Sequence, residues 1–447
     1  MNIKALGLAA AGMSMLAIAG AGMASADPSP SSDYRQLAGV GSDTTQNVMN
    51  ALGNVVVDGS GNKILASWDA TGSSPITTKG SGTLASAVAA GATSITTSSA
   101  LVPAPVVGGK LVLDNGVSGS EETVTVTSVS APTYGVSATT LAHAAGATVR
   151  GNCVLSRPVG SGNGRKVLDA SIRGVTSSVN TANTNKLGGC ADFARSSSYS
   201  SGLLGGETAG SNEGTFVPFA TDAVTFATLS TSNVARRLSV ASLKSIYQCS
   251  FHAPGGTQSI QPLLPQAGSG TRQFFLSSIG LDQNALVPAP GSGEGTGTAL
   301  GDCVKDKAAD GVTDIIEHDG TFVTNANQII PFSTAQFIAQ ISGNQTPNNL
   351  GRIAIGSIAP TATPTSFRSS LYINPSGGTA AFPFTRQVYN VIPTSLLTDP
   401  TYQSVFTGTN GQLGAANNSQ ICQNPGVIQT FGFNVDPLCG DTSKKSG

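Results

Sequence analysis

The segment LAGVGSDTTQNVMNAL, residues 37–52, contains the pattern that decides the fold. Its first five residues are small or apolar and end in glycine, as expected of a short buried strand. The turn that follows is built from helix-capping residue types, Ser42, Asp43 and Thr44. Apolar residues then recur at roughly helical spacing, at Val48, Met49 and Leu52. The segment therefore predicts a strand, a tight turn and the start of a helix.

Two later segments repeat this order of strand, glycine-rich turn and helix. A predicted strand at 154–159 leads into Gly-Ser-Gly-Asn-Gly at 160–164. Another at 260–264 leads into Gly-Ser-Gly-Thr at 268–271. Alternation of strands and helices predicts an α/β fold with a mostly parallel or mixed sheet.

Residues 80–150 follow a different pattern. They are rich in Thr and Val, alternate with a period of two, and are divided by Gly, Pro and Asn. This pattern predicts a small inserted all-β module, with Lys79 and Asn152 as near neighbours at its base. The alternative is that these strands extend the α/β domain itself.

The remaining sequence indicates two α/β lobes. The apolar run 216–227 predicts a buried strand that crosses between lobes, and 382–393 returns as a similar strand. Residues 240–249 predict a helix, because Leu243, Ile246 and Tyr247 fall on one face.

Composition and the first residues indicate an exported protein. Residues 1–26 read as a signal peptide, with Lys4, an apolar run and Ala-Ser-Ala at the cleavage site. A membrane anchor is the alternative. The chain carries 23 basic and 24 acidic residues, a net charge of −1, which disfavours binding to nucleic acid. We expect a secreted or extracytoplasmic protein of a bacterial cell envelope.

The cysteine count supports an oxidising compartment. Six cysteines allow 15 pairings, and the simplest joins neighbours: Cys153–Cys190, Cys249–Cys303 and Cys422–Cys439. The cysteine spacing does not fit a zinc site, and only three histidines are present, His143, His252 and His318. We expect no metal and no cofactor.

The three turns are candidate anion cradles. The first backbone N–H groups of a helix have no partner within the helix, and the helix dipole is positive there. Glycine lets the backbone approach an anion, and Ser or Thr adds hydroxyl donors. In open α/β folds, ligands bind at the carboxyl ends of strands, where these turns lie.

The sequence contains no recognisable motif of a serine hydrolase or of a P-loop nucleotide hydrolase. None of the histidines adjoins a G-x-S-x-G motif, and the chain has no G-x-x-x-x-G-K-[ST] loop. We therefore expect no enzymatic activity and no catalytic residues, with a secreted hydrolase as a minor alternative.

At these turns the chain resembles the type 2 periplasmic-binding-protein superfamily. It is most similar to the phosphate-binding proteins of ABC importers, in a divergent form found in actinobacteria. The resemblance covers most of 37–79 and 151–440. It rests on the motifs Gly39–Thr44, Gly160–Gly164, Asp192–Ser197, Asp222–Thr225 and Gly268–Thr271.

The resemblance implies a two-lobed fold with mixed sheets, closing on a tetrahedral oxyanion. Lobe 1 would comprise 37–79, 151–226 and 380–440, and lobe 2 would comprise 227–379. The ligand-binding residues carried over by position are Asp43, Thr44, Ser161, Ser197, Ser269, Gly270 and Thr271.

Three positions depart from the family pattern. Ser197 replaces an aspartate that accepts the ligand's proton, and Pro265 replaces an arginine, for which Arg272 or Arg195 is a candidate substitute. Asp43 replaces a hydroxyl donor. It either accepts the proton of a protonated ligand, repels an anion, or simply caps the helix.

The leading hypothesis is a secreted, monomeric solute-binding protein. It would capture phosphate or a related oxyanion and deliver it to the membrane subunits of an ABC importer. The alternative is an extracellular or cell-surface interaction protein that keeps the scaffold but has lost its ligand.

Overall fold

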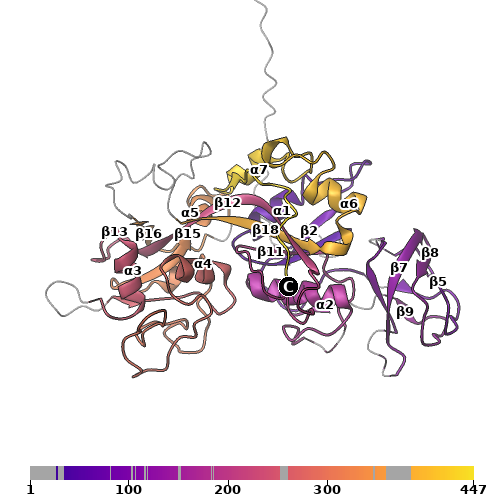
Figure 1. The fold of residues 1–447 in the computed structure, drawn as a ribbon, viewed down its shortest axis with the longest axis horizontal. Coiled ribbons are helices and arrows are strands. Elements are labelled where there is room, and N and C mark those ends of the chain that lie inside the picture. The colour runs from indigo at the N-terminus through magenta and orange to yellow at the C-terminus, as the bar shows by residue number, and fades with distance from the viewer. Residues whose placement is uncertain are drawn as a thin grey trace, which may run out of the picture.

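The structure is a computed structural model of the 447-residue chain. It describes residues 27–28, 35–80, 82–101, 104–105, 107–114, 117, 119–149, 153–182, 184, 186–251, 260–345, 348–358 and 384–447. The expected signal peptide at 1–26 and His252 lie outside the described residues. Figure 1 shows two α/β lobes side by side, with a smaller β-sheet unit beyond one of them.

Lobe 1 is built on a mixed sheet. Strand β1 runs parallel to β2 and β11, while β18 lies antiparallel to both β11 and β12. Its strands are β1 (Leu37–Gly41), β2 (Leu65–Ser67), β11 (Phe193–Ser196), β18 (Thr385–Pro393), the first part of β12 (Gly214–Leu229), and β19 (Asn434–Val435).

Helices cover both faces of this sheet. Strand residues alternate between faces, so Leu37 packs in one core with Val48 and Met49 of α1 (Gln46–Leu52). Ala38 and Val40 pack on the other face with Val167 of α2 (Ser161–Arg173). The C-terminal elements α6 (Pro400–Tyr402), η3 (Gln403–Thr407) and α7 (Pro425–Thr430) join the α1 side.

Lobe 2 continues from the same long strand. The second part of β12 pairs with β15 (Gln328–Ser333) and β16 (Ile353–Ile355), and β15 pairs with β14 (Gln261–Pro262). A short pair, β13 (Arg237–Leu238) and β17 (Ser357–Ile358), lies beside it. The helices are α3 (Val240–Tyr247), α4 (Gly270–Ser278) and α5 (Thr334–Ile341).

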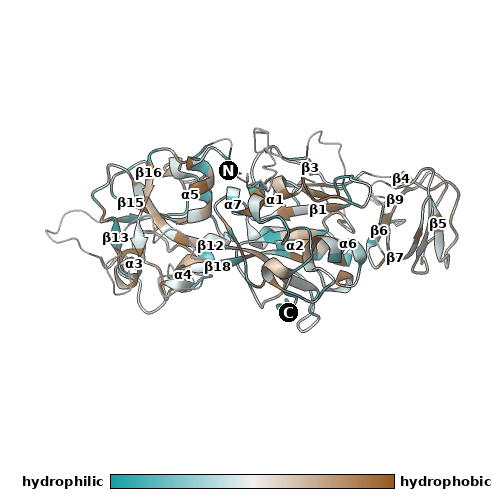
Figure 2. Ribbon diagram, turned by 90° about the horizontal axis from the view of Figure 1, so that it is seen from above, coloured by the Kyte–Doolittle hydropathy of each residue, from teal (hydrophilic) through white to brown (hydrophobic). Residues whose placement is uncertain are grey.

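Strands β12 and β18 connect the lobes. Residues Gly214–Ala223 of β12 pair with β18, and from Val224 onward its partner is β15. In Figures 1 and 2 both strands run across the middle of the molecule. The expected crossing strand at 216–227 and the helix at 240–249 are therefore both present, and the predicted two-lobed α/β fold class with mixed sheets is confirmed.

Residues 82–149 form a separate six-stranded antiparallel sheet. Its strand order is β4 (Gly82–Thr83), β9 (Thr148–Val149), β6 (Lys110–Leu113), β7 (Glu122–Ser130), β8 (Thr133–Val136) and β5 (Ser94–Thr96). The sheet encloses its own apolar cluster, which includes Leu111, Val124 and Tyr134. We call this unit the β module.

The chain enters and leaves the β module at one place. Strand β3 (Ile76–Thr77) pairs with β10 (Val154–Leu155), and Thr78 N donates to Cys153 O at 3.0 Å. A module inserted between two strands of lobe 1 requires the segments before and after it to lie side by side, as these two do.

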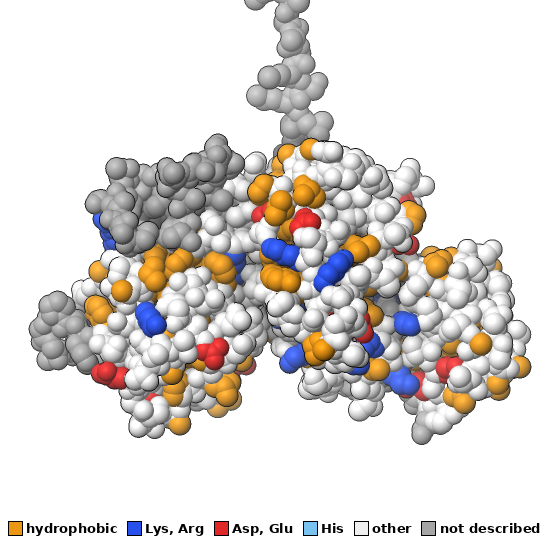
Figure 3. Space-filling model, viewed as in Figure 1, with side chains coloured by type: hydrophobic (Ala, Val, Ile, Leu, Met, Phe, Trp, Pro, Cys, Tyr) orange, Lys and Arg blue, Asp and Glu red, His pale blue; other side chains and the backbone are white. Residues whose placement is uncertain are grey.

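The disulfides pair neighbouring cysteines as predicted. Cys153–Cys190 and Cys422–Cys439 lie in lobe 1 cores, and Cys249–Cys303 lies in lobe 2. On the face drawn in Figure 3 charged side chains are few, in keeping with a charged content of 11%. In the described part of the chain, every helix is too short or too polar to cross a membrane.

Candidate functional site

The three predicted turns meet between the lobes. The turn after β1 and the one before α2 lie side by side, because Gly41 forms a parallel bridge with Val159. The turns before α2 and α4 also touch: Gly162 N donates to Gly268 O at 3.2 Å. The N-termini of α2, from lobe 1, and α4, from lobe 2, therefore face one buried region.

Close backbone approach explains two of the glycines in these turns. A Cβ on Gly164 would lie 2.4 Å from the Gly41 Cα atom. A Cβ on Gly270 would lie 2.2 Å from Ser197 Oγ and 2.7 Å from Ser161 Oγ. At Gly164 the backbone of the neighbouring turn leaves no room for a side chain, and at Gly270 a Cβ would displace the two serine hydroxyls.

A first group of predicted residues joins α2 to α4. Ser161 Oγ accepts a hydrogen bond from Ser197 N at 3.0 Å and lies 3.2 Å from Ser197 Oγ. Both serines are fully buried, and Gly270 packs directly against their hydroxyls. The structure thus brings together the candidates from the second and third turns.

A second group centres on Arg386 of β18. Its Nη2 donates to Thr271 Oγ1 at 2.9 Å and to Asp222 Oδ2 at 2.8 Å. Thr271 Oγ1 also lies 3.4 Å from Thr44 Oγ1, so the first and third turns are linked through hydroxyls. The other oxygen of Asp222 accepts from Ser333 Oγ at 2.9 Å, which fixes the carboxylate that holds Arg386.

The N-terminus of α4 already holds an anionic group. Glu317 Oε2 accepts hydrogen bonds from Ser269 Oγ and, at 3.2 Å, from Thr271 N. Ser269 is also the N-cap of α4, accepting from Arg272 N at 3.0 Å. The helix dipole favours a negative charge at this position.

Asp43 lies against Glu317 and does not cap α1. The N-cap of α1 is Thr45, and neither carboxylate oxygen of Asp43 accepts a hydrogen bond from a described residue. Burial, followed by the charge of Glu317, raises the pKa of Asp43 well above its usual value. Burial acts to raise the pKa of Glu317, but contact with Asp43, the positive charge of His318, the hydrogen bond from Ser269 and the charge of Arg386 together outweigh it and lower that pKa to about 2. Of the two neighbouring carboxyl groups, Glu317 is therefore the more acidic.

His318 completes the buried cluster. One ring nitrogen, Nε2, lies 2.9 Å from Thr44 Oγ1, and the backbone carbonyl accepts from Gln340 Nε2 at 3.0 Å. Burial lowers the pKa of His318 to about 4, so the ring is neutral at pH 7. Its Nδ1 has no hydrogen-bond partner among the described residues.

Several other buried polar atoms around this cluster also lack a partner in the described part of the chain. They are Ser42 Oγ, Thr45 Oγ1, Asn47 Nδ2 and Arg386 Nη1. Buried polar groups are nearly always hydrogen-bonded in folded proteins. Ser42 and Thr45 belong to the turn after β1, Asn47 to α1 and Arg386 to β18.

The two arginines proposed to replace the family's arginine have structural roles instead. Arg195 Nε donates to Ser42 O at 2.9 Å, and its Nη1 donates to Ser67 Oγ at 2.7 Å. These hydrogen bonds hold the turn after β1 in place. Arg272 donates to Pro265 O and pairs with Asp306, both at 3.0 Å. The cation that reaches the site is Arg386.

Sequence reasoning missed Glu317, His318 and Arg386 as site residues. Glu317 and His318 stand in the polar segment Glu-His-Asp-Gly at 317–320, which matches no motif. Arg386 is the one charged residue in the predicted strand 382–393, most of which is apolar. A charged residue in a predicted buried strand is the signal that could have identified it, because charged side chains are seldom buried without a partner.

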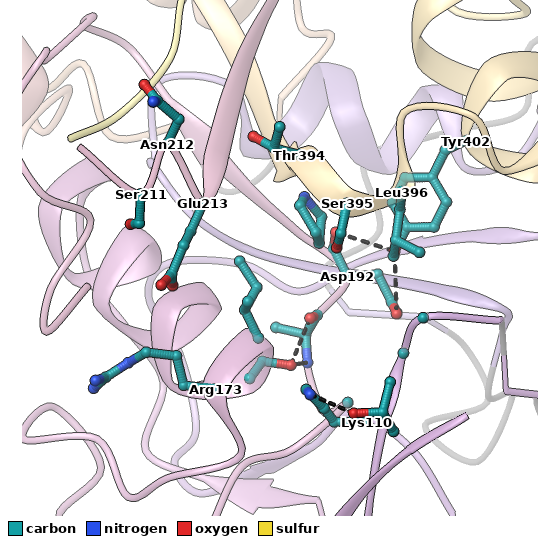
Figure 4. Close-up of a pocket in the computed structure, with 18 residues that line it drawn as sticks. Lys110, Arg173, Asp192, Ser211, Asn212, Glu213, Thr394, Ser395, Leu396 and Tyr402 are labelled. Carbon is teal, nitrogen blue, oxygen red and sulfur yellow. Dashed lines mark hydrogen bonds between the residues drawn. The ribbon is translucent and has the colours of Figure 1, made fainter. Parts of the chain in front are cut away.

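A separate pocket of about 680 Å³ lies where the β module meets lobe 1. Figure 4 shows Lys110 of the β module on one side, with Arg173 of α2 and Leu396 and Tyr402 on others. None of the predicted ligand-binding residues lines it.

No family model and no curated protein sequence matches this chain. Among solved structures, it is similar to a possible phosphate binding protein from Planctomyces limnophilus, with 12% identity and a TM-score of 0.30, covering 63% of this chain and 82% of that one. It is also similar to PstS from Borrelia burgdorferi, with 13% identity and a TM-score of 0.29, covering 62% and 87%.

A third similar structure is the high-affinity periplasmic phosphate-binding protein PfluDING bound with phosphate. Identity is 15% and the TM-score is 0.36, covering 63% of this chain and 83% of that one. At this distance the likeness assigns neither a ligand nor a role. The two-lobed mixed α/β class rests on the strands and cores of the chain itself.

Proposed function

We propose that this protein is a secreted solute-binding protein that captures phosphate or a related oxyanion between its lobes, without catalysis. The observation that carries the proposal is the pair of helix N-termini. Those of α2 and α4 come from different lobes and face one buried region, and α4 already holds the carboxylate of Glu317. Donors that hold one oxyanion suit another of similar size and charge.

The site supplies donors of three kinds. The hydroxyls of Ser161, Ser197 and Thr271 lie at the two helix N-termini. Backbone N–H groups at the helix N-termini are the second kind, and of these Thr271 N donates to the carboxylate of Glu317. Arg386 offers Nη1, which is buried and has no partner among the described residues. Hydrogen bonds from a charged donor to an oxyanion are roughly twice as strong as neutral ones.

The lobe connection suits capture and release. Strands β12 and β18 pass between the lobes side by side, and the site residues Asp222 and Arg386 are register partners on them. Bending of this pair would open the site and separate α2 from α4. Delivery to the membrane subunits of an ABC importer, as a monomer at the bacterial cell envelope, is part of the proposal.

One observation favours the alternative of an interaction protein without a ligand. Glu317 occupies the donors of α4, and together with Asp43 it places two carboxyl groups where an anion would bind. A carboxylate beside an anion is unfavourable unless a proton or a cation lies between them. A scaffold that has lost its ligand would tolerate this arrangement.

Calorimetric titration with phosphate, after bound ligand has been stripped by partial unfolding and refolding, tests the proposal. We expect saturable binding that is weakened by about 1–3 kcal/mol in Thr271→Val and in Ser161→Ala, because each removes a donor to the anion. Ser278→Ala, at the other end of α4, is the matched control. Absence of heat up to millimolar phosphate would support the interaction protein.

A further inference from the structure

Asp43, Glu317 and His318 form a compact set of metal-binding side chains. One potential ligand atom of each lies within 4.8 Å of those of the other two. Their exposed fractions are 5%, 2% and 4%, so the set is closed to bulk solvent. We propose that these three residues bind a divalent transition-metal ion at the interface of the lobes.

Two independent features point to a ligand at this set. Both oxygens of Asp43 are buried without a hydrogen-bond donor among the described residues, and so is Nδ1 of His318. Buried polar atoms of this kind are rare in folded proteins, and the group that the Asp43 carboxyl meets is itself a carboxyl, that of Glu317. A cation bound to the Asp43 carboxylate would provide its oxygens with a partner.

The local charge balance also favours a dication. Asp222 and Arg386 neutralise one another at 2.8 Å. Arg195, the other buried cation near Asp43, directs its donors to Gly39, Gly41 and Ser42 carbonyls and to Ser67. Asp43 and Glu317 therefore remain as two buried carboxyl groups, and an ion of charge +2 matches the pair when both are ionised.

Surrounding hydrogen bonds orient the ligands. Glu317 Oε2 is held by Ser269 Oγ and Thr271 N, which leaves Oε1 on the side of Thr44. The His318 backbone is fixed through its carbonyl by Gln340. Metal ligands in proteins are commonly held by such outer partners, whose loss lowers affinity by about 10–100-fold.

The ligand types select the class of metal. One imidazole nitrogen with two carboxylate oxygens suits Zn²⁺ or a similar first-row ion, whereas Mg²⁺ and Ca²⁺ prefer sites made of oxygen alone. Three protein ligands leave a coordination position open. If the proposed function holds, an oxygen of the captured oxyanion would fill that position, with the metal screening it from Asp43 and Glu317.

A second carboxylate cluster in the chain provides the control. Asp169, Glu207 and Glu213 also lie within 4.8 Å of one another but include no imidazole. Asp169 pairs with Arg173 at 3.2 Å, and Glu207 accepts from Ser446 Oγ at 3.0 Å. We expect this cluster to bind Zn²⁺ weakly or not at all.

The test is calorimetric titration of chelator-treated protein with ZnCl₂ in phosphate-free buffer. We expect one equivalent to bind, with affinity reduced at least tenfold in Glu317→Gln and in His318→Asn and unchanged in Glu213→Gln. Circular dichroism in metal-free buffer verifies that each variant is folded, and Asp43→Asn replaces any variant that is not. Binding of Co²⁺ should produce visible absorption that His318→Asn alters.

Two results would overturn the proposal. One is no binding of Zn²⁺ to the folded wild-type protein. The other is binding that Glu213→Gln abolishes while Glu317→Gln and His318→Asn leave it intact. Because no phosphate is present, failure here is separate from failure of oxyanion capture, which is titrated in metal-free buffer.

Discussion

The amide of Thr271 donates a hydrogen bond of 3.2 Å to the carboxylate of Glu317, so the first turn of α4 holds an anion supplied by the chain itself. The two residues are 46 positions apart, and both belong to lobe 2. The contact shows that the N-terminus of α4 can hold an oxyanion. It also means that a solute at this position would meet the negative charge of Glu317.

Removing the charge of Glu317 should strengthen oxyanion binding in the absence of metal. Glu317→Gln keeps an oxygen able to accept from Ser269 and Thr271 but removes a buried negative charge next to the solute. We expect phosphate affinity in metal-free buffer to rise about tenfold, or about 1.4 kcal/mol. Calorimetry measures this, with Glu213→Gln as the control of equal charge change. Weaker binding in Glu317→Gln would mean that the glutamate itself contacts the ligand favourably.

Arg386 should support both stability and binding. Arg386→Met leaves Asp222 as a buried carboxylate without its cation, which costs about 3–5 kcal/mol of unfolding free energy. The double variant Arg386→Met/Asp222→Asn should recover part of that loss, because the uncompensated charge is gone. Denaturant unfolding measures stability, and calorimetry should show that both variants lose phosphate affinity. Full affinity in a folded double variant would exclude Arg386 from the site.

The disulfide in lobe 2 should contribute more than the short C-terminal one. Cys249–Cys303 closes a sequence separation of 54 residues, whereas Cys422–Cys439 closes 17. On the chain-entropy account, replacing the first pair by serine should destabilise the fold by about 1 kcal/mol more than replacing the second. Thermal and denaturant unfolding of the two double variants decides this. The reverse order would show that lost packing, not loop closure, dominates.

The β module should be dispensable for oxyanion capture. It contributes none of the residues of the candidate site, and Thr78 and Cys153 remain hydrogen-bonded neighbours at its base. Replacing residues 80–150 by a short Gly-Ser linker removes contacts with lobe 1 such as Thr123 Oγ1 to Gly174 O at 3.0 Å and the ion pair of Glu121 with Lys186 at 3.1 Å. We expect a cooperatively folded chain with phosphate affinity within about threefold of the full chain. An unfolded product would show instead that the module is integral to lobe 1.

Local sequence patterns predict the strands and helix starts, whereas tertiary contacts determine which side chains meet in the candidate site. The strand at 37–41 and the cap of α4 at Ser269 follow from residue types within a few positions of each other. Arg386 depends on β18 pairing with β12 more than 160 residues earlier, so no local pattern reveals that it reaches Thr271. By its position Arg195 is a candidate ligand-binding arginine. In the structure its guanidinium donates instead to the carbonyl oxygens of Gly41 and Ser42 in the turn after β1.

The most direct measurement of the central claim is a crystal structure of the protein grown with phosphate. We expect a tetrahedral anion between the N-termini of α2 and α4, within hydrogen-bond distance of Ser161, Thr271 and Arg386. Metal at Asp43, Glu317 and His318 would appear separately by anomalous scattering. A closed structure at millimolar phosphate, with Glu317 still on Ser269 and Thr271 and no anion between the helices, would contradict the account.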